Sequence, residues 1–488
     1  MRTILALDQG TTNTKAILLT GTGRVLAQAS RPMQVSYPRP GWAEQSAAAI
    51  WSTVAGVVAD LVGTTEHEIA AIAISNQRES IVLWDAATGE PVGPCVIWQC
   101  RRSASRCAEL QAAGHEADVV ARTGLGLDPL FPAAKLAWLL DHTPGAREAA
   151  RAGKLRAGTV DSWLVWKLTG GKQHATDFSN ASRTQLFNLD ALAWDGTLCE
   201  LFDVPGSLLP EVLPSDAFFG TTARSVTALP EGIPIHAVIG DSHAAAFGHG
   251  ISGPGCVKAT MGTGSSLMAV TGKRVTSHHS LSSTIAWAQN GNVLYALEGN
   301  IAVSGQTAAF ARQLLNLKDE IALTELARTV DNSDGVSFVP ALAGLGAPHW
   351  NPNARGTICG MSLGTTAAHI ARAALEAIAL QAVDVLHAME ADLGADMSLL
   401  FVDGGASKND FLVQLLADLA DRSVRRGTIA ELSPYGAGKM AAEALQMWDA
   451  SGDRSAAAQF EPNMSAVARA EILTQWSTAL RRTMYEPT

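Results

Sequence analysis

An aspartate at an expected strand-to-helix junction is the first residue of this chain whose position suggests chemistry. In VIGDSHAAAF (238–247), a β-branched apolar run and Gly-Asp precede small residues typical of a helix, which places Asp241 at the junction. Its carboxylate can cap the helix, or it can act as a general base for a substrate hydroxyl beside it. The neighbouring Ser242 and His243 cannot complete a hydrolase triad, which needs separately placed groups. The local sequence leaves cap and base open.

Three Gly-rich segments have the composition of phosphate-binding loops. DQGTTNTK (8–15) and GTGSS (262–266) each lie between apolar runs, and DGGASKN (403–409) lies between an expected strand and an expected helix. Glycine lets the backbone approach an anion, and amides and hydroxyls donate hydrogen bonds to it. A single such loop is equally an ordinary hairpin turn. Three loops favour a phosphorylated ligand, although YGAGKM (435–440) lacks P-loop spacing and no G-x-G-x-x-G fingerprint is present.

The elements that must position these residues alternate between strand and helix, which indicates an α/β fold. TILALDQGTTNTKAILLTGTGRVLA and GCVKATMGTGSSLMAVTGKRV are both expected to be β-hairpins with a Gly/Thr turn. This weak internal similarity predicts a duplicated design with one such loop in each half. The segment 368–396 is expected to be a long amphipathic helix ended by Gly394, and the Gly-rich stretch at 245–255 marks a domain boundary.

Composition excludes several classes of function. The chain has 488 residues, 47% hydrophobic and 17% charged, which is enough for a large core and two to four domains. A net charge of -10 without a basic run argues against nucleic-acid and anionic-membrane partners. No apolar run suggests a signal peptide or a membrane span. Six cysteines without a C-x-x-C pair fit reduced thiols in the cytoplasm.

The ordered motifs of the chain resemble those of the FGGY carbohydrate kinases, with the glycerol kinases most similar among them. The residues 356–376 fit a sequence pattern of that family, including His369, Ala373 and Glu376. The other matching stretches span nearly the whole chain: ALDQGTTNTKAI, SNQRES, VIWQCRRS, VDSWLVWKLTGG, TDFSNASRTQLFNLDALAWD, PALAGLGAPHWNPNARGTICGMSLGTT and DGGASKNDFLVQLLAD.

The resemblance implies an actin-like (ribonuclease H-like) ATPase fold, with two similar α/β domains around a central cleft. It implies transfer of the γ-phosphoryl group of ATP, bound with Mg²⁺, to a terminal hydroxyl of a small polyol or sugar. We expect a substrate-side domain over 1–248, a nucleotide-side domain over 249–450 and a helical tail over 451–488. The expected assembly is a homodimer or homotetramer.

The resemblance also implies roles for individual residues. Asp241 matches the catalytic base, and Asp8 matches the carboxylate that orients Mg²⁺ through water, with Asp241 sharing the metal. The residues that match the nucleotide site are Thr11, Thr12, Asn13, Lys15, Thr263, Gly305, Gly405 and Asn409. Lys15 stands where glycerol kinases usually have arginine. Arg78, Glu79 and Trp98 match residues that hold the polyol, although each has an ordinary structural role on local grounds.

Three positions of the acceptor pocket depart from glycerol kinases. Leu130 stands in place of tyrosine, Ser242 in place of glutamine and Ser266 in place of phenylalanine. Near the nucleotide, Ala309 replaces another glutamine. Because a site built to hydrogen-bond particular hydroxyls discriminates by up to ~10⁴-fold or more, these changes are expected to disfavour glycerol. The hypothesis is a polyol or ketose of about four to six carbons. Glycerol kinase proper and a non-catalytic actin-like ATPase are the alternatives.

Overall fold

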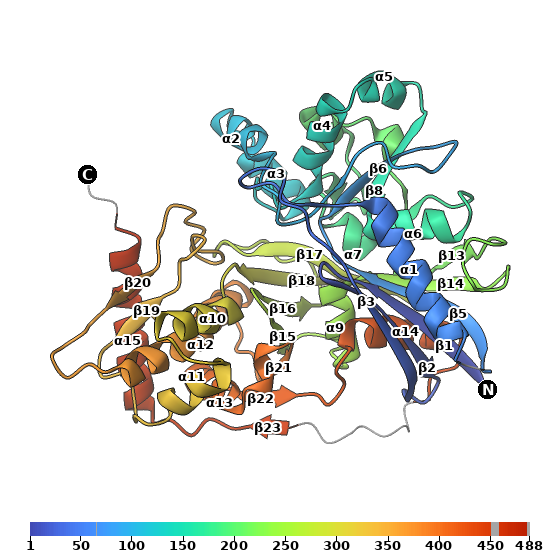
Figure 1. The fold of residues 1–488 in the computed structure, drawn as a ribbon. Coiled ribbons are helices and arrows are strands. Elements are labelled where there is room, and N and C mark those ends of the chain that lie inside the picture. Colours follow the sequence, from blue (N-terminus) through green and yellow to red (C-terminus); the bar gives the residue numbers. More distant parts are fainter. Residues whose placement is uncertain (65, 450–457, 486–488) are drawn as a thin grey trace.

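Two β-sheets, one in each half of the chain, organise the fold (Figure 1). The computed structural model describes residues 1–64, 66–449 and 458–485. The first sheet has the order β13-β14-β5-β1-β2-β3 and is formed by Phe218–Thr221, Pro234–Gly240, Glu68–Asn76, Arg2–Gln9, Asn13–Thr20 and Val25–Pro32. The second has the order β17-β18-β16-β15-β21-β22-β23 and is formed by Ser282–Gln289, Asn292–Ile301, Ser265–Thr271, Cys256–Met261, Leu399–Asp403, Ser423–Arg426 and Ala458–Phe460.

The two sheets share one topology, as expected for a duplicated design. In the first, β1 pairs antiparallel with β2 and parallel with β5, and β5 continues parallel to β14. In the second, β15 pairs antiparallel with β16 and parallel with β21, and β21 continues parallel to β22. Each half therefore begins with a hairpin whose Gly/Thr turn lies at the carboxyl end of the central strand.

The middle of the central strand β1, residues 4–7, is apolar because helices cover both of its faces. Leu5 and Leu7 belong to the core under α1 (Ala47–Val62), whereas Ile4 and Ala6 belong to the core that includes α14 (Leu432–Ala444). Alternate side chains of a strand point to opposite faces, so a strand covered on both sides has no polar face. The buried strand ends at the polar turn, which places Asp8 and the first Gly/Thr loop at its edge.

The helix α14 crosses to the first half of the molecule and packs on α9 (Asp241–Gly248). It contains the whole YGAGKM stretch, whose glycines allow close packing: a Cβ at Gly436 would lie 1.8 Å from the carbonyl oxygen of Ala244, and one at Gly438 would lie 2.9 Å from Leu19 Cδ2. The glycines of this stretch therefore serve helix packing. Ser433, in the same helix, donates from Oγ to the carbonyl oxygen of Asp241 at 3.0 Å.

The remaining helices and small strands complete the two halves. The expected long helix is α12 (Ala367–Leu393), with left-handed Gly394 as its C-cap, as predicted. In the described part of the chain, no helix has the length and apolar composition needed to cross a membrane. Of the expected helical tail, residues 451–457 and 486–488 lie outside the described residues. The tail is not helical throughout, because Ala458–Phe460 pairs with β22 as β23, whereas α15 (Ala466–Thr483) is a helix that buries Trp476 against the second core. The other elements near the site are α7 (Phe178–Ala181), α10 (Gly305–Leu314), α11 (Glu320–Ala327) and α13 (Asp410–Ala420).

Candidate active site

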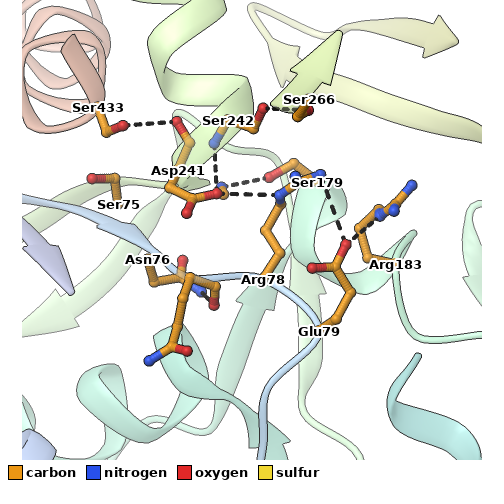
Figure 2. Close-up of polar contacts among 12 residues, drawn as sticks. Ser75, Asn76, Arg78, Glu79, Ser179, Arg183, Asp241, Ser242, Ser266 and Ser433 are labelled. Carbon is orange, nitrogen blue, oxygen red and sulfur yellow. Dashed lines mark hydrogen bonds and ion pairs between the residues drawn. The ribbon is translucent and has the colours of Figure 1, made fainter. Parts of the chain in front are cut away.

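Asp241 lies where β14 ends and α9 begins, in the middle of the polar contacts drawn in Figure 2. The helix-cap alternative for Asp241 is not realised: Gly240 is the N-cap residue, and Asp241 is the first residue of the helix. Its carboxylate accepts the backbone N–H of Ser242 at 2.6 Å and faces Arg78 Nε at 3.2 Å. Burial raises the pKa of Asp241, while the charge of Arg78 lowers it. The carboxylate is thus available for proton transfer rather than committed to capping.

The backbone before Asp241 is held by α7. Ser179 accepts the backbone N–H of Gly240 at 2.9 Å, and Asp177 caps α7 by accepting from the backbone N–H groups of Ser179 and Asn180. Asn180 and Asn76 exchange two side-chain amide hydrogen bonds, at 3.0 and 3.1 Å. These contacts hold the junction between β14 and α9 in place. They thereby position Asp241 near the end of β5, the strand that Arg78 follows in the chain.

Arg78 and Glu79 lie in the turn that follows β5, and the segment of Leu130 is held next to them. Glu79 has a left-handed backbone with φ 56°, and its carboxylate accepts from Arg183 Nε at 2.7 Å. Buried Lys135 donates from Nζ to the carbonyl oxygens of Glu79, at 2.9 Å, and Leu130, at 2.6 Å. Burial lowers the pKa of Lys135 to about 8. This lysine therefore joins the segment of Leu130 to the residues expected to hold the acceptor.

The two serines that replace larger residues contact each other across the halves of the molecule. The hydroxyl oxygens of Ser242 and Ser266 are 3.2 Å apart (Figure 2). Lys258 Nζ, which is buried on β15, donates to Ser242 Oγ at 2.7 Å. Ser266 Oγ donates to Glu298 Oε1 at 2.8 Å, and Glu298 in turn binds Arg78. A continuous polar chain therefore links Lys258 to the guanidinium beside Asp241.

Asp8 supplies a second carboxylate near Asp241. Burial, followed by the charge of Asp241, raises the pKa of Asp8 to about 7, and Ser75 Oγ donates to the carboxylate at 2.7 Å. Two carboxylates that repel each other suit a divalent cation, and Mg²⁺ needs only one or two protein carboxylates when water and phosphates complete its shell. The donor set thus fits Mg²⁺, although the described residues contain no cluster of three or more possible protein ligands.

Replacement of Asp8 by asparagine is expected to stabilise the ligand-free protein. Removing an ionised carboxylate whose pKa is raised should increase Tm by about 2–4 °C at pH 8. The increase in Tm should be small near pH 4, grow as the pH rises towards 7 and stay constant at higher pH. The reason is that the buried carboxylate destabilises the folded protein only when Asp8 is ionised. Thermal unfolding of both proteins across this pH range measures it. A gain that did not depend on pH would contradict the repulsion between the carboxylates.

The first Gly/Thr loop lies beside Trp98. Thr11 Oγ1 accepts from Trp98 Nε1 at 2.9 Å and donates to Gln77 Oε1 at 3.3 Å. Thr12 is exposed, and its hydroxyl accepts from Asn13 Nδ2 at 3.2 Å. Trp98 is 37% exposed. The structure therefore joins an expected nucleotide residue directly to an expected acceptor residue.

The second Gly/Thr loop meets the beginning of α10 and the end of β21. Gly305 donates its N–H to the carbonyl oxygen of Gly262 at 2.9 Å, and a Cβ on Gly305 would lie 2.5 Å from that oxygen. The carbonyl oxygen of Thr263 accepts from the backbone of Ser304 and Gln306. At Gly404, φ is 88° and a Cβ would lie 2.6 Å from the carbonyl oxygen of Met261, whereas a Cβ on Gly405 would meet open space. Thr263, Gly305 and Gly405 are therefore gathered at one point.

Two expected nucleotide residues have partners within the protein. Lys15, which lies opposite Asp8 in the β1–β2 register, pairs from Nζ with Glu431 Oε2 at 2.6 Å. Asn409 caps α13 through its side-chain oxygen and donates from Nδ2 to Thr324 Oγ1 at 2.9 Å. Asn409 can donate its second amide hydrogen to a ligand, and the Lys15 ammonium, which carries three donors, can contact a phosphate while it stays paired with Glu431.

Sequence reasoning missed Glu298, Lys258 and Arg183 as members of the site. Glu298 and Lys258 are charged residues within otherwise apolar strands, β18 and β15, and both are buried. That placement was an available signal, since such residues are rarely buried without partners. Arg183 lies in the TDFSNASRT stretch, but its contacts with two carboxylates depend on the packing of α7 against the second half.

Family models match both halves of the chain. The model described as "FGGY family of carbohydrate kinases, N-terminal domain" matches residues 3–248, and the model of the C-terminal domain matches residues 257–445. The chain belongs to the FGGY family of carbohydrate kinases. It is therefore an ATP-dependent phosphotransferase with an alcohol group as acceptor, and the alternative of a non-catalytic ATPase is dropped.

Relatives of this FGGY kinase include curated glycerol kinases. Those of Burkholderia cenocepacia (strain HI2424) and Alkalilimnicola ehrlichii are both 46% identical, covering 98% and 99% of this chain and 97% and 98% of their own lengths. A solved Plasmodium falciparum glycerol kinase with ADP has a TM-score of 0.95 at 30% identity, covering 100% of this chain and 99% of that one. A xylulose kinase from Rhodospirillum rubrum has a TM-score of 0.85 at 27% identity, covering 99% of each chain. These structures support the actin-like, two-domain fold.

Proposed function

We propose that this FGGY kinase phosphorylates a terminal hydroxyl of a polyol or ketose of about four to six carbons. The observation that carries the proposal is the Ser242–Ser266 pair, whose hydroxyl oxygens lie 3.2 Å apart where glycerol kinases have glutamine and phenylalanine. A small polar pair occupies much less volume than those two side chains. Less side-chain volume and two hydroxyls at these positions support an acceptor with additional carbons and hydroxyls.

The hydrogen-bond polarity of this pair is determined by the groups at its two ends. The ammonium of Lys258 can only donate, so Ser242 Oγ accepts from it. The carboxylate of Glu298 can only accept while ionised, so Ser266 donates to it. The remaining hydroxyl proton, that of Ser242, then points to Ser266. Both serines thus offer only lone pairs to a ligand, which suits hydroxyl groups that donate.

Leu130 contributes to the same preference. It stands where glycerol kinases have tyrosine, and its backbone carbonyl is held by Lys135 at 2.6 Å, close to Glu79. Leucine removes a phenolic hydrogen bond and a rigid ring from that wall. A site loses strong discrimination for a particular hydroxyl when its specific partner is absent. The leucine at position 130 therefore favours an acceptor that is also bound through the carbons far from its reacting hydroxyl.

In the proposed mechanism, Asp241 accepts the proton of the attacking hydroxyl, and Arg78 orients both the carboxylate and the acceptor. Because burial raises the pKa of Asp241, its affinity for a proton exceeds that of an exposed aspartate. The loops around Thr11–Asn13, Thr263 and Gly405 hold the phosphates, and Gly305 and Asn409 flank the nucleotide. Asp8 and Asp241 would hold Mg²⁺, which supplies positive charge against the developing charge on the phosphates. Positioning and charge stabilisation are the main requirements of this reaction.

Glycerol is the second candidate acceptor. The 46% identity to curated glycerol kinases over nearly the whole chain favours it. Arg78, Glu79, Trp98 and Asp241, which match the residues that hold one end of the polyol, are all present. The two candidates therefore differ only in how the farther part of the acceptor is bound.

The experiment that separates them is acceptor-dependent ADP release with glycerol, erythritol, threitol, pentitols and xylulose. The proposal expects the highest kcat/KM on one of the longer acceptors. The highest value on glycerol would contradict it, and ADP release that ignored every acceptor would contradict the kinase mechanism itself.

A further inference from the structure

Glu298 connects the two halves of the molecule at the site. Its side chain is fully buried on β18 and lies between two arginines of the first half. Arg78 Nη1 and Nη2 donate to the two carboxylate oxygens at 2.9 and 2.8 Å, and Arg183 Nη1 lies 2.9 Å from Oε2. Ser266 completes the set from β16. Glu298 is therefore a carboxylate of the second half that contacts two buried arginines of the first half.

The bidentate pair leaves Arg78 with a single orientation. Both terminal nitrogens of the guanidinium are directed to Glu298, so Nε is the nitrogen that faces Asp241 Oδ1, at 3.2 Å. A planar guanidinium held by two parallel hydrogen bonds cannot rotate without breaking both. The position of Arg78 relative to Asp241 is therefore determined by a carboxylate from the other half.

Glu298 lies among basic side chains. It is faced by Arg78, Arg183, His243 and Lys258, and the two arginines hold its pKa well below the ordinary value. Its two hydrogen bonds to the Arg78 guanidinium are therefore charge-assisted, which makes them stronger than bonds between neutral groups.

We propose that Glu298 is a positioning residue for phosphoryl transfer. It clamps Arg78 so that the guanidinium faces Asp241 and the acceptor. The inference rests on the proposed role of Asp241 as the base. The structural alternative is that Glu298 only joins the two halves, in which case its loss would lower stability without a specific effect on the acceptor.

The test is Glu298→Gln, measured with the best acceptor of the wild-type enzyme. Because a misplacement of ~1 Å can cost ~10²-fold, kcat/KM for the acceptor should fall about tenfold or more. The KM for ATP should stay within about twofold, since the nucleotide loops are untouched. An unchanged acceptor kcat/KM, or a loss matched by an equal rise in the KM for ATP, would overturn the proposal.

A matched control is Glu376→Gln, which removes a buried carboxylate paired with Arg372 in α12, outside the site. It should lower Tm without lowering acceptor kcat/KM. Glu298→Asp keeps the charge but shortens the side chain, so it should also reduce acceptor kcat/KM. If Glu298→Gln does not fold, this variant carries the test, and wild-type acceptor kcat/KM in it would overturn the proposal. A wild-type enzyme without acceptor-dependent ADP release would instead contradict the proposed function.

Discussion

Asp241→Asn is expected to reduce kcat by about three orders of magnitude, within the ~10²–10⁴-fold contribution of general-base catalysis. Asparagine retains the size and the hydrogen-bond acceptor of the side chain, so the backbone contact to Ser242 and the junction of β14 with α9 should remain. It cannot take the proton of the attacking hydroxyl. The Kd of ATP should stay nearly unchanged, because the nucleotide loops do not depend on Asp241. Steady-state turnover and equilibrium ATP binding measure the two effects.

Asp161→Asn is the matched control for that variant. Asp161 is also a buried carboxyl with its pKa raised to about 7, here by burial and by Asp177, but it lies in the helix Val160–Leu168 of the first half. Its replacement should leave kcat near the wild-type value. Near-normal kcat in Asp241→Asn, or an equal loss in both variants, would contradict the assignment of Asp241 as the base.

The triple variant Leu130→Tyr, Ser242→Gln and Ser266→Phe is expected to move acceptor preference towards glycerol. The ratio of kcat/KM for glycerol to that for the best longer acceptor should rise by about 10²-fold or more. The larger side chains exclude the added carbons, and the hydrogen-bond donors of the new tyrosine and glutamine bind glycerol hydroxyls. The amide oxygen of glutamine can still accept from Lys258, whereas phenylalanine leaves Glu298 without the Ser266 hydroxyl. Some loss of absolute activity should therefore accompany the change in preference.

The control for the triple variant is the double variant Ser242→Ala and Ser266→Ala. It removes the two hydroxyls without adding volume, so it should lower kcat/KM for the longer acceptor and leave the preference for glycerol no higher than in the wild type. Acceptor ratios from both variants, measured in one assay, separate the effect of polarity from that of space. A triple variant whose acceptor ratio equals that of the wild type would contradict the assignment of these three positions to specificity.

Local sequence predicted the parts of the fold that depend on neighbouring residues. The two hairpins, the duplicated design and the end of α12 at Gly394 follow from apolar alternation and turn residues, and the structure confirms them. Of the two alternatives left open for Asp241, the helix cap is not formed. Gly240 is the N-cap residue instead, because β14 continues to it opposite Asn76 and Ser179, far away in the sequence, accepts its N–H.

The parts of the site that the sequence did not predict are contacts between residues far apart in the chain. Arg78 and Glu298 come from different sheets, and they meet because α7 packs on β17 beside β18. The pair formed by Lys15 and Glu431 depends on the passage of α14 to the first half. No local pattern specifies such partners, although buried charges within apolar strands indicated that partners must exist.

The most direct test of the central claim is an internal competition between acceptors. The enzyme is given ATP with equal concentrations of glycerol and the best longer acceptor, and the two phosphorylated products are quantified by ³¹P NMR at low conversion. Their ratio equals the ratio of the two kcat/KM values. The structure of the pocket around Ser242 and Ser266 predicts that the longer phosphorylated product predominates. Predominance of glycerol phosphate would contradict the claim that these residues select an acceptor of about four to six carbons.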